Sequence, residues 1–456
     1  MDLDNKANPE DNTEIEYRLS ALSINSYNNI PESLIKPIQN ILSNQYSEEF
    51  EGLNEIRKML SSMETNCIND VVKSGIVPIL IRMAYTRPYE FIYQVCWVLC
   101  NIGSGDSSST KYLISISTLD FFDQIFNLNT NSYALYDQIV WALGNIAGDC
   151  TDNRCILSSS NIFQKLLAYA DILPLDLNDY QANLIWAISN CVRGNPLPKA
   201  EIAIATEKYF IKAFLYFNDI NILTDACWSL YYISNIVCNN LLECINISQK
   251  IVNLLIDPIL QIAIPLFKLL GNIIHGCDNS WNYLNELNII KVILKGITLE
   301  KKALCRESAF VISKLCRRYP NTVQVMIEQN MFDFLFKLIE EEDYSMKIVL
   351  YWVFCDSISV STSQQIKNIY KRDWISEMVK FLFFTSDENI KDAVLGTIVK
   401  VLNCLENHFD NQFVLLYNRL QDYSCKDGNF TKNYYDLVGL LREKGFDRKN
   451  EGERMD

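Results

Sequence analysis

The chain has 456 residues, of which 21% are charged, and its formal net charge is −14 at pH 7. A single compact core rarely grows to this length, whereas stacked repeats share a core that continues from one repeat to the next. The negative net charge argues against a nucleic-acid-binding protein, which usually carries a basic patch, and it suits a basic partner. Simple solvation of the surface is the alternative explanation of this charge.

Cysteine use and hydropathy indicate an intracellular protein. The fifteen cysteines are scattered and form no C-x-x-C motif, and several lie in apolar helical stretches, where a free thiol packs as a small hydrophobic group. The polar, acidic start is unlike a secretory signal. The longest apolar stretch, residues 251–270, is broken by an aspartate, two prolines and a lysine, so it predicts buried helices and no membrane span.

By composition, the chain divides into three parts. Residues 1–45 form a polar, acidic segment that contains prolines, among them Pro31 and Pro37, and we expect it to be loosely packed. Helical repeats begin near residue 46, and we expect them to continue to about residue 420. The last part, residues 421–456, is a charged tail that we expect to be disordered near its end.

A tryptophan and an asparagine recur four residues apart in the first half of the chain. The tryptophans are 44 and 45 residues apart, and the pairs are Trp97 with Asn101, Trp141 with Asn145, and Trp186 with Asn190. Residues four apart lie on one face of a helix, so each pair is stacked along that face. A period of about 40–47 residues is typical of helical solenoids of the armadillo or HEAT type. We call these three pairs the Trp/Asn ladder.

The same four-residue spacing continues along the chain at steps of 40–42 residues, with changed residue types. The later pairs are Trp228 with Tyr232, Lys268 with Asn272, Phe310 with Lys314, and Trp352 with Asp356. We therefore predict an all-α chain of roughly eight to ten repeats. Glycines that follow several pairs, among them Gly105, Gly148 and Gly194, predict helix ends with positive φ.

The ladder has the chemistry of a peptide-binding groove. An Asn side chain carries donors and acceptors, so a row of them can hold an extended peptide backbone. Tryptophans on neighbouring repeats form slots for Lys or Arg stems, with cation–π attraction of about 0.5–2 kcal/mol each. Asp149 and Asp225 stand where they could add a negative charge. The alternative is that the tryptophans are core residues, but asparagine is mildly unfavourable inside helices, so its regular recurrence favours the groove.

With these residues the chain resembles importin α, the family of adaptors that bind nuclear localisation signals. The segments WALGNIAGD (141–149) and LTDACWSL (223–230) carry much of the resemblance, which extends over about residues 50–360. It implies a right-handed solenoid of three-helix armadillo repeats whose third helices line a groove for an extended peptide. It also implies a protein that is present in the cytoplasm and the nucleus.

The resemblance implies a major peptide-binding site on the second to fourth repeats and their continuation. Besides the Trp/Asn ladder, the matching residues are Ser104, Gly105, Thr110, Gln138, Asp149, Arg193, Asp225, Trp228 and Tyr232. In the family, the acid and the threonine at the positions of Asp149 and Thr110 hold the ammonium group of a key lysine. Lys- and Arg-rich cargo segments are therefore the expected partners.

A minor site, which the family forms on later repeats, is eroded in this chain. The residues that match it are Asn272, Asp278, Glu307, Phe310 and Trp352. Lys314 stands where asparagine is expected and would place a positive charge in a groove meant for cations, and Asp356 replaces another asparagine. We predict a weak or absent minor site and a preference for monopartite basic signals.

The beginning of the chain departs further from the family, which starts with a basic segment that binds importin β. Residues 1–40 carry three basic and seven acidic side chains, so they cannot mimic a basic signal. The contact with importin β is lost, is made elsewhere, or depends on residues before this start. The resemblance also implies an exportin for recycling, although its binding features are not recognisable near the C-terminus.

Other classes of function have little support in the sequence. The chain has only two histidines, His275 and His408, and neither a phosphate-binding glycine loop nor a nucleophile elbow is present. We expect no enzymatic activity, cofactor, metal, nucleic acid or membrane partner. The main alternative is an armadillo peptide-binding scaffold outside nuclear import. A further one is a divergent import factor that acts without importin β as a chaperone for basic cargo, or in spindle or pore assembly.

Overall fold

The computed structural model is built of α-helices throughout the part of the chain that it describes, with no strand there. The described residues are 30–62, 67–128, 132–241, 245–276, 278–370, 373–405, 416–418, 420 and 431–444. Their contacts divide the chain into two units, Met1–Ile236 (unit 1) and Val237–Asp456 (unit 2).

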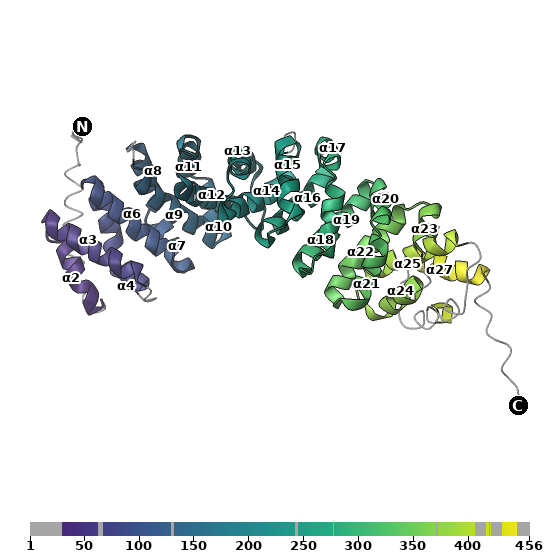
Figure 1. The fold of residues 1–456 in the computed structure, drawn as a ribbon. Helices are drawn as coiled ribbons and strands as arrows, with labels where there is room; N and C mark the ends of the chain where they lie inside the picture. The colour runs from purple at the N-terminus through teal and green to yellow at the C-terminus, as the bar shows by residue number, and fades with distance from the viewer. Residues whose placement is uncertain are drawn as a thin grey trace, which may run out of the picture. The chain divides into compact units, whose positions relative to one another are not determined.

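Unit 1 is a stack of helices in which two shorter ones usually precede a longer one (Figure 1). In chain order the helices are α2 (Glu32–Ile41), α3 (Tyr46–Ser61), α4 (Cys67–Lys73), α5 (Ile76–Ala84), α6 (Tyr89–Gly103), α7 (Ser107–Ser115), α8 (Thr118–Asn127), α9 (Tyr133–Asp149), α10 (Thr151–Ser158), α11 (Asn161–Ile172), α12 (Asn178–Val192), α13 (Ala200–Tyr216) and α14 (Ile220–Leu241), of which α14 runs on into unit 2.

Unit 2 repeats the same alternation of shorter and longer helices. Its helices are α15 (Ile245–Ile256), α16 (Leu260–Gly276), α17 (Asp278–Glu286), α18 (Ile289–Thr298), α19 (Lys302–Arg318), α20 (Asn321–Glu328), α21 (Met331–Glu341), α22 (Tyr344–Val360), α23 (Ser363–Ile369), α24 (Asp373–Phe384), α25 (Glu388–Cys404) and α27 (Lys432–Glu443).

The helix α9 illustrates why these segments form repeats. Its apolar residues Leu135, Ile139, Leu143 and Ile146 recur every three or four positions and are fully buried. Each such side chain stabilises the fold by about 1.5–3 kcal/mol relative to an exposed one. The Ser132 side chain accepts a hydrogen bond from the backbone N–H of Leu135 and so caps the start of the helix.

The longer helices line up because each packs against the longer helix of the next repeat. In unit 1, α3 packs on α6, α6 on α9, and α9 on α12. In unit 2, α16 packs on α19, α19 on α22, α22 on α25, and α25 on α27. We call α3, α6, α9, α12 and α14 of unit 1, and α16, α19, α22, α25 and α27 of unit 2, the ladder helices. The described part contains ten ladder helices, and the nine that lie within residues 46–420 agree with the eight to ten repeats predicted there. The fold is an all-α armadillo solenoid.

Two repeats depart from the three-helix pattern. Between α12 and α14 a single helix, α13, takes the place of two shorter ones. The next helix, α14, is 22 residues long because it runs through a kink at Val237, where φ is −110° and ψ is 18°. The first short helix of the following repeat is thereby joined to the ladder helix before it.

Both predicted terminal segments contain helices that belong to the packed fold. Residues 32–41, within the segment expected to be loosely packed, form α2, which packs on α3 and buries Leu34, Ile38 and Ile41. Residues 432–443, within the predicted tail, form α27, which packs on α25. Polar composition concealed these short helices, because each buries only one apolar stripe. Residues 1–29 and 445–456 lie outside the described part.

Candidate functional site

The structure places the ladder tryptophans at the surface of the ladder helices of unit 1. Trp97 lies on α6, Trp141 on α9, Trp186 on α12 and Trp228 on α14. Trp141 is 46% exposed and the other three are half-buried, whereas Trp374 of unit 2 is a fully buried core residue at 1%. The four tryptophans are therefore less buried than a core residue such as Trp374, and Trp141 presents the largest exposed fraction among them.

The ladder asparagines bridge neighbouring ladder helices. The Nδ2 group of Asn145 donates a hydrogen bond to the Cys100 carbonyl oxygen at 3.4 Å, and Asn190 Nδ2 donates to the Gly144 carbonyl oxygen at 3.0 Å. Asn101 Nδ2 donates to Ser61 Oγ at 3.0 Å. Each amide thus makes a bond to the preceding repeat. The Oδ1 atoms of Asn101 and Asn145 have the chemistry to accept from a peptide N–H, whereas Asn190 is 1% exposed and its Oδ1 accepts from Arg193. The asparagines therefore hold the stack together.

Two glycines of α9 allow the next ladder helix to approach closely. A Cβ atom at Gly144 would lie 2.2 Å from the ring of Trp186, and a Cβ atom at Gly148 would lie 3.0 Å from Asn190 Nδ2. The prediction of a helix end with positive φ is correct at Gly194, where φ is 87°, but wrong at Gly148, which lies inside α9. Gly148 is needed for packing against the neighbouring helix.

Asp149, at the end of α9, is held in place by three polar neighbours. Ser107 Oγ donates a hydrogen bond to Asp149 Oδ1, Thr110 Oγ1 donates to Oδ2 at 2.7 Å, and Asn153 Nδ2 donates to Oδ2 at 3.1 Å. Partial burial acts to raise the pKa of Asp149, but the hydrogen bonds from Ser107 and Thr110 outweigh it and lower this pKa below 3.8. A fixed carboxylate therefore stands one helical turn beyond Asn145.

Asp225 supplies a second carboxylate, on α14, in a different environment. Burial raises the pKa of Asp225 to about 6, and the positive charge of Arg193 opposes this rise. Arg193 is exposed at the end of α12 and donates from Nη1 to Asn190 Oδ1 at 2.9 Å. Next to Asp225, the rings of Trp228 and Tyr232 stack with their centroids 5.9 Å apart. This end of the predicted major site therefore changes charge near neutral pH.

The remaining predicted residues of the major site are Gln138, Ser104 and Gly105. Gln138 is 9% exposed, and its Oε1 has no hydrogen-bond partner within the described structure. Ser104 Oγ donates to the Asn101 carbonyl oxygen at 2.7 Å, within its own helix end. The positive φ predicted at Gly105 is wrong, and a Cβ atom there would lie 2.8 Å from Ser109 Oγ and 3.1 Å from the Ile102 carbonyl oxygen, which leaves little room for a side chain.

In unit 2, lysines stand at two of the positions that correspond to the Trp/Asn ladder. Lys268 takes the place of a tryptophan and Lys314 the place of an asparagine. Lys268 Nζ forms an ion pair with Glu307 at 2.9 Å. Lys314 Nζ lies 4.7 Å from the centroid of the Phe310 ring and donates to the Gly271 carbonyl oxygen at 3.1 Å. Phe310 is 50% exposed. The aromatic slot beside Phe310 is thus already occupied by a lysine.

The slot at Trp352 is filled in the same way. The Cζ atom of Arg317 lies 5.4 Å from the centroid of the Trp352 ring, and Arg317 Nε forms an ion pair with Asp356 at 2.7 Å. Ser313 Oγ also donates to Asp356. Asn272 is half-buried on α16, and the side chain of Asp278 lies outside the described part. Three of the predicted minor-site residues, Glu307, Phe310 and Trp352, therefore each lie beside a cation of the protein.

Several residues of these slots were not singled out from the sequence. In unit 1, the Cζ atom of Arg57 on α3 lies 4.3 Å from the Trp97 ring centroid, so the first slot also holds a cation of the protein. Ser107 and Asn153 orient Asp149 from α7 and α10. The period would have pointed to Arg57, which lies 40 residues before Trp97. No pattern in the sequence marks Ser107 or Asn153.

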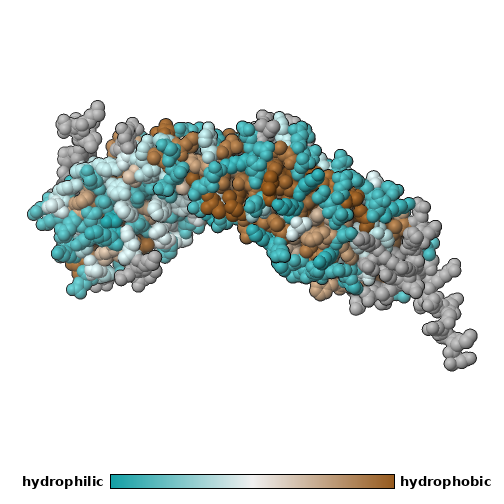
Figure 2. All heavy atoms as spheres, in the orientation of Figure 1, coloured by the Kyte–Doolittle hydropathy of each residue, from teal (hydrophilic) through white to brown (hydrophobic). Residues whose placement is uncertain are grey.

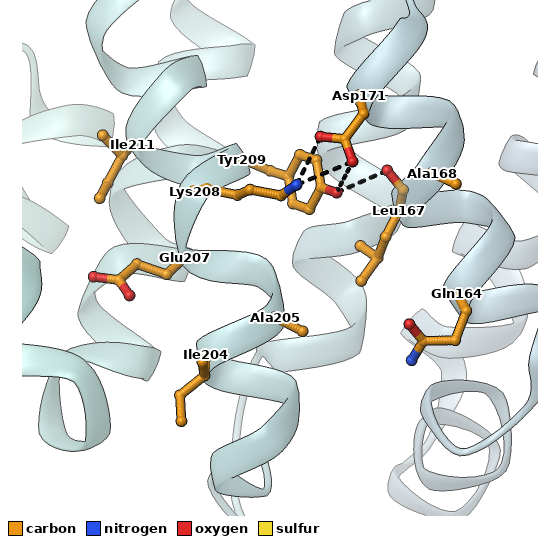
Figure 3. A pocket seen from close by; sticks show the side chains of 10 residues that line it. All are labelled: Gln164, Leu167, Ala168, Asp171, Ile204, Ala205, Glu207, Lys208, Tyr209 and Ile211. Carbon is orange, nitrogen blue, oxygen red and sulfur yellow. Dashed lines mark hydrogen bonds and ion pairs between the residues drawn. The ribbon is translucent and has the colours of Figure 1, made fainter.

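A separate hollow of about 510 Å³ lies between α11 and α13 and contains none of the predicted residues (Figure 3). Two of its charged groups pair with each other: Lys208 Nζ lies 2.8 Å from Asp171, and Tyr209 Oη donates to Asp171 at 3.0 Å and to the Leu167 carbonyl oxygen at 2.8 Å. Gln164 and Glu207 also line the hollow. Hydrophobic side chains gather over these helices in Figure 2, and Ile204 is 59% exposed.

The described residues contain neither a cluster of metal ligands nor a helix that could span a membrane. No group of three or more His, Cys, Asp or Glu side chains lies close enough together there to hold a metal ion. Among the same residues, every helix is too short or too polar to cross a lipid bilayer.

Comparisons with known proteins agree with the fold. Residues 65–104 match the armadillo/β-catenin-like repeat family. Importin subunit alpha-1b of Oryza sativa subsp. japonica is 28% identical over 285 residues, which cover 61% of this chain and 52% of the rice protein. Importin subunit alpha-2 of Arabidopsis thaliana is 30% identical over 210 residues, 45% of this chain and 37% of that protein.

The chain thus aligns with about half the length of the curated relatives, or less. Among solved structures, a crystal structure of an engineered protein superposes with a TM-score of 0.73 and 16% identity, over 90% of this chain and 99% of that one. That likeness supports the fold alone. Together, the armadillo match, the related importin subunits and the Trp/Asn ladder show that the chain is an importin-α-like armadillo-repeat protein.

Proposed function

We propose that the chain is a nuclear import adaptor that binds basic segments in extended conformation along the ladder helices of unit 1. The observation that carries this proposal is the combination of surface tryptophans with the fixed carboxylate of Asp149 on the same helix, α9. The related rice and Arabidopsis proteins are importin α subunits, which supports the same role.

The geometry suggests how a lysine-rich segment would be held. Ladder helices pack about 8–10 Å apart, and an extended peptide rises about 3.3 Å per residue, so one repeat spans about three peptide residues. The Oδ1 atoms of Asn101 and Asn145 would accept from peptide N–H groups. A lysine stem would lie between Trp141 and Trp186, with its ammonium group directed to Asp149. Charge-assisted hydrogen bonds of this kind are roughly twice as strong as neutral ones.

Unit 2 would contribute little to this binding. Arg317 already lies over Trp352, and Lys314 lies over Phe310, so a basic side chain of the cargo would have to displace a cation of the protein. We therefore propose that single basic clusters are bound, and that signals with two separated clusters gain little from the second one.

An import adaptor also needs partners that carry it through the nuclear pore. By resemblance to the family, we propose importin β as the partner for import and an exportin for recycling, with the protein present in both cytoplasm and nucleus. The acidic sequence of residues 1–29 does not resemble the basic segment through which the family binds importin β. The contact with importin β would then involve other residues.

The proposal is tested by titrating the purified protein with a fluorescent lysine-rich peptide and measuring fluorescence anisotropy. We expect micromolar or tighter binding by the intact chain, and loss of binding to an alanine-substituted peptide. Asp149→Lys should weaken binding at least a hundredfold while leaving the far-ultraviolet circular dichroism unchanged. A matched control is Asp152→Lys, an equal charge change in the first turn of the adjacent helix α10.

The outcomes separate the candidate functions. Normal binding by Asp149→Lys would show that the site is placed wrongly. Absence of binding by the intact chain would favour an armadillo scaffold for other extended partners. If the basic peptide binds as expected, nuclear accumulation of a fluorescent basic cargo in permeabilised cells, with and without importin β, then tests the transport role.

A further inference from the structure

Two half-buried lysines of unit 2, Lys314 on α19 and Lys400 on α25, form no ion pair with any described residue. Lys314 Nζ donates to the Gly271 carbonyl oxygen at 3.1 Å, and Lys400 Nζ donates to the Ser359 carbonyl oxygen at 2.6 Å. Lys314 Nζ also lies 4.7 Å from the Phe310 ring centroid. An ammonium group has three donors and a full positive charge, and one carbonyl oxygen, with or without an aromatic face, provides neither three acceptors nor an opposite charge. Partial burial lowers the pKa of both lysines, which shows that their charge is poorly compensated.

The acids near these lysines are already engaged by other cations. Asp356 on α22, between the two, is paired with Arg317 at 2.7 Å and accepts from Ser313. Glu307 on α19 is paired with Lys268 at 2.9 Å. The surface along α19, α22 and α25 therefore keeps an excess of positive charge, although the chain as a whole carries −14.

The same surface has room for a ligand side chain. A hollow of about 270 Å³ lies between α22, α25 and α27, and its lining includes Asp356, Lys400 and Asn433. Gly396 also lines it, in the helical position that Trp352 holds on α22. A Cβ atom at Gly396 would lie 3.0 Å from Asn433 Nδ2, so the Asn433 side chain packs over this glycine, while Lys400, one helical turn further along, lines the hollow beside it. A carboxylate entering the hollow would find Lys400 as the lining cation that no described acid pairs, since Asp356 is already paired with Arg317.

The spacing of the two lysines defines the shape of the ligand. Helices α19, α22 and α25 pack in succession, and two steps of about 8–10 Å separate the first from the last. An extended chain covers that length in about five or six residues. The aromatic slot on α22 between them, at Trp352, is filled by Arg317, so the ligand does not need a basic side chain to occupy it.

We propose that unit 2 binds an acidic segment of a protein partner in extended conformation, with two carboxylates about six residues apart that pair with Lys314 and Lys400. The protein would then carry two surfaces of opposite preference on the same type of helix. Unit 1 would take a basic segment, and unit 2 an acidic one.

The test uses the full chain and a fluorescein-labelled peptide of twelve residues. The peptide contains two Glu-Glu pairs centred six residues apart, and its other residues are Gly and Ser. Two comparison peptides place the pairs three residues apart or replace glutamate by glutamine. We expect anisotropy to show binding of the first peptide at low salt, at least fivefold weaker binding of the second, and none of the third. Equal binding of all three peptides, or no binding of the first, would overturn the proposal.

Variants then locate the site. Lys314→Gln combined with Lys400→Gln should weaken binding of the acidic peptide at least tenfold. The charge-matched control is Lys291→Gln combined with Lys337→Gln, at exposed positions of α18 and α21, and it should change binding less than twofold. Equal losses in both double variants would show diffuse charge attraction and overturn the site. If the first double variant fails to fold, Lys400→Gln alone replaces it, with an expected loss of at least threefold.

Two further measurements keep this proposal separate from the proposed function. Asp149→Lys should leave binding of the acidic peptide unchanged, so its effect on the basic peptide is read independently. A twelve-nucleotide oligothymidine should not displace the acidic peptide at equal concentration. Displacement by the oligonucleotide would mean that the surface binds polyanions in general, against a site for an acidic protein segment.

Discussion

The ladder helices of the two units correspond to one another in packing but carry opposite net charge. The five ladder helices of unit 1 carry nine acidic and two basic side chains, whereas the five of unit 2 carry eleven basic and six acidic ones. Both sets bury the same kind of apolar stripe and pack in the same succession. The packing of the repeats therefore determines where a groove residue lies, whereas the charge of the residue at that position can differ between repeats.

One hydrogen bond shows how this freedom arises. Asn190 in unit 1 donates to the Gly144 carbonyl oxygen, one residue before the ladder asparagine of the preceding helix. Lys314 in unit 2 donates to the Gly271 carbonyl oxygen, which stands one residue before Asn272. The lysine thus keeps the bond between repeats that the asparagine makes, and adds a charge. A substitution at a ladder position can therefore keep the hydrogen bond between repeats and still change the group that is presented to a ligand.

The largest effect is expected from breaking the close packing of unit 1 with Gly144→Ala. The new methyl group would overlap the Trp186 ring, so the ring has to leave its position across α9. Overpacking of this kind destabilises by about 1–3 kcal/mol, and we expect basic-peptide affinity to fall at least thirtyfold. Urea unfolding and anisotropy measure the two effects.

The control for this change is Gly439→Ala in unit 2. An added Cβ atom there has no neighbour within 4 Å, and Gly439 lies exposed inside α27. Alanine should therefore raise stability by about 0.5–1 kcal/mol, because glycine is unfavourable inside helices. A Gly144→Ala variant that unfolds and binds like the parent would show that the fit of Trp186 across α9 is not needed.

The second prediction converts unit 2 toward unit 1. Phe310→Trp combined with Lys314→Asn restores an aromatic and amide pair and removes the cation from the slot. We expect isothermal titration calorimetry with the basic peptide to change from one binding event to two, the new one at least tenfold tighter than any binding by unit 2 of the parent. An unchanged stoichiometry would mean that Arg317 and Lys268 still repel the ligand.

The third prediction concerns pH and Asp225. Burial raises the pKa of Asp225 from 3.8 to about 6, so its effect on stability is most favourable below about pH 4 and is lost as pH rises through 6. At pH 7, Asp225→Asn should raise stability by about 1–2 kcal/mol, since the buried charge is removed. The same variant should bind the basic peptide three- to fivefold more weakly at pH 7 and like the parent at pH 5.

Asp179→Asn is the matched control for Asp225, because Asp179 is exposed in the first turn of α12. It should change neither the unfolding free energy nor the pH dependence of binding by a measurable amount. Should Asp225→Asn bind equally at both pH values, Asp225 has no contact with the ligand.

The smallest effect is expected at the first slot, where unit 1 resembles unit 2. Arg57 lies over Trp97, so it competes with a basic side chain for the ring face. Arg57→Met should strengthen binding of the basic peptide two- to threefold, a change of about 0.4–0.7 kcal/mol. Lys58→Met, one residue later and exposed, serves as the control. Weaker binding by Arg57→Met would instead make Arg57 part of the site.

Much of the fold could be predicted from the sequence, because in a helical repeat protein both surface and core residues recur at the repeat interval. The positions of Trp97, Trp141 and Trp186 on successive ladder helices are as the interval predicts. The ends were less predictable: α2 and α27 each present one apolar stripe among polar residues, and only their neighbours α3 and α25 make these segments helical.

The sequence by itself determined the helical class, the repeat interval and the face on which each ladder residue stands, because these follow from spacing along one helix. Only the tertiary structure decided which side chain fills each slot. Ser107 orients Asp149, Arg57 covers Trp97, and Arg317 covers Trp352, and each contact joins residues from 35 to 42 positions apart. Such contacts depend on how neighbouring helices pack, which periodicity within one helix does not specify.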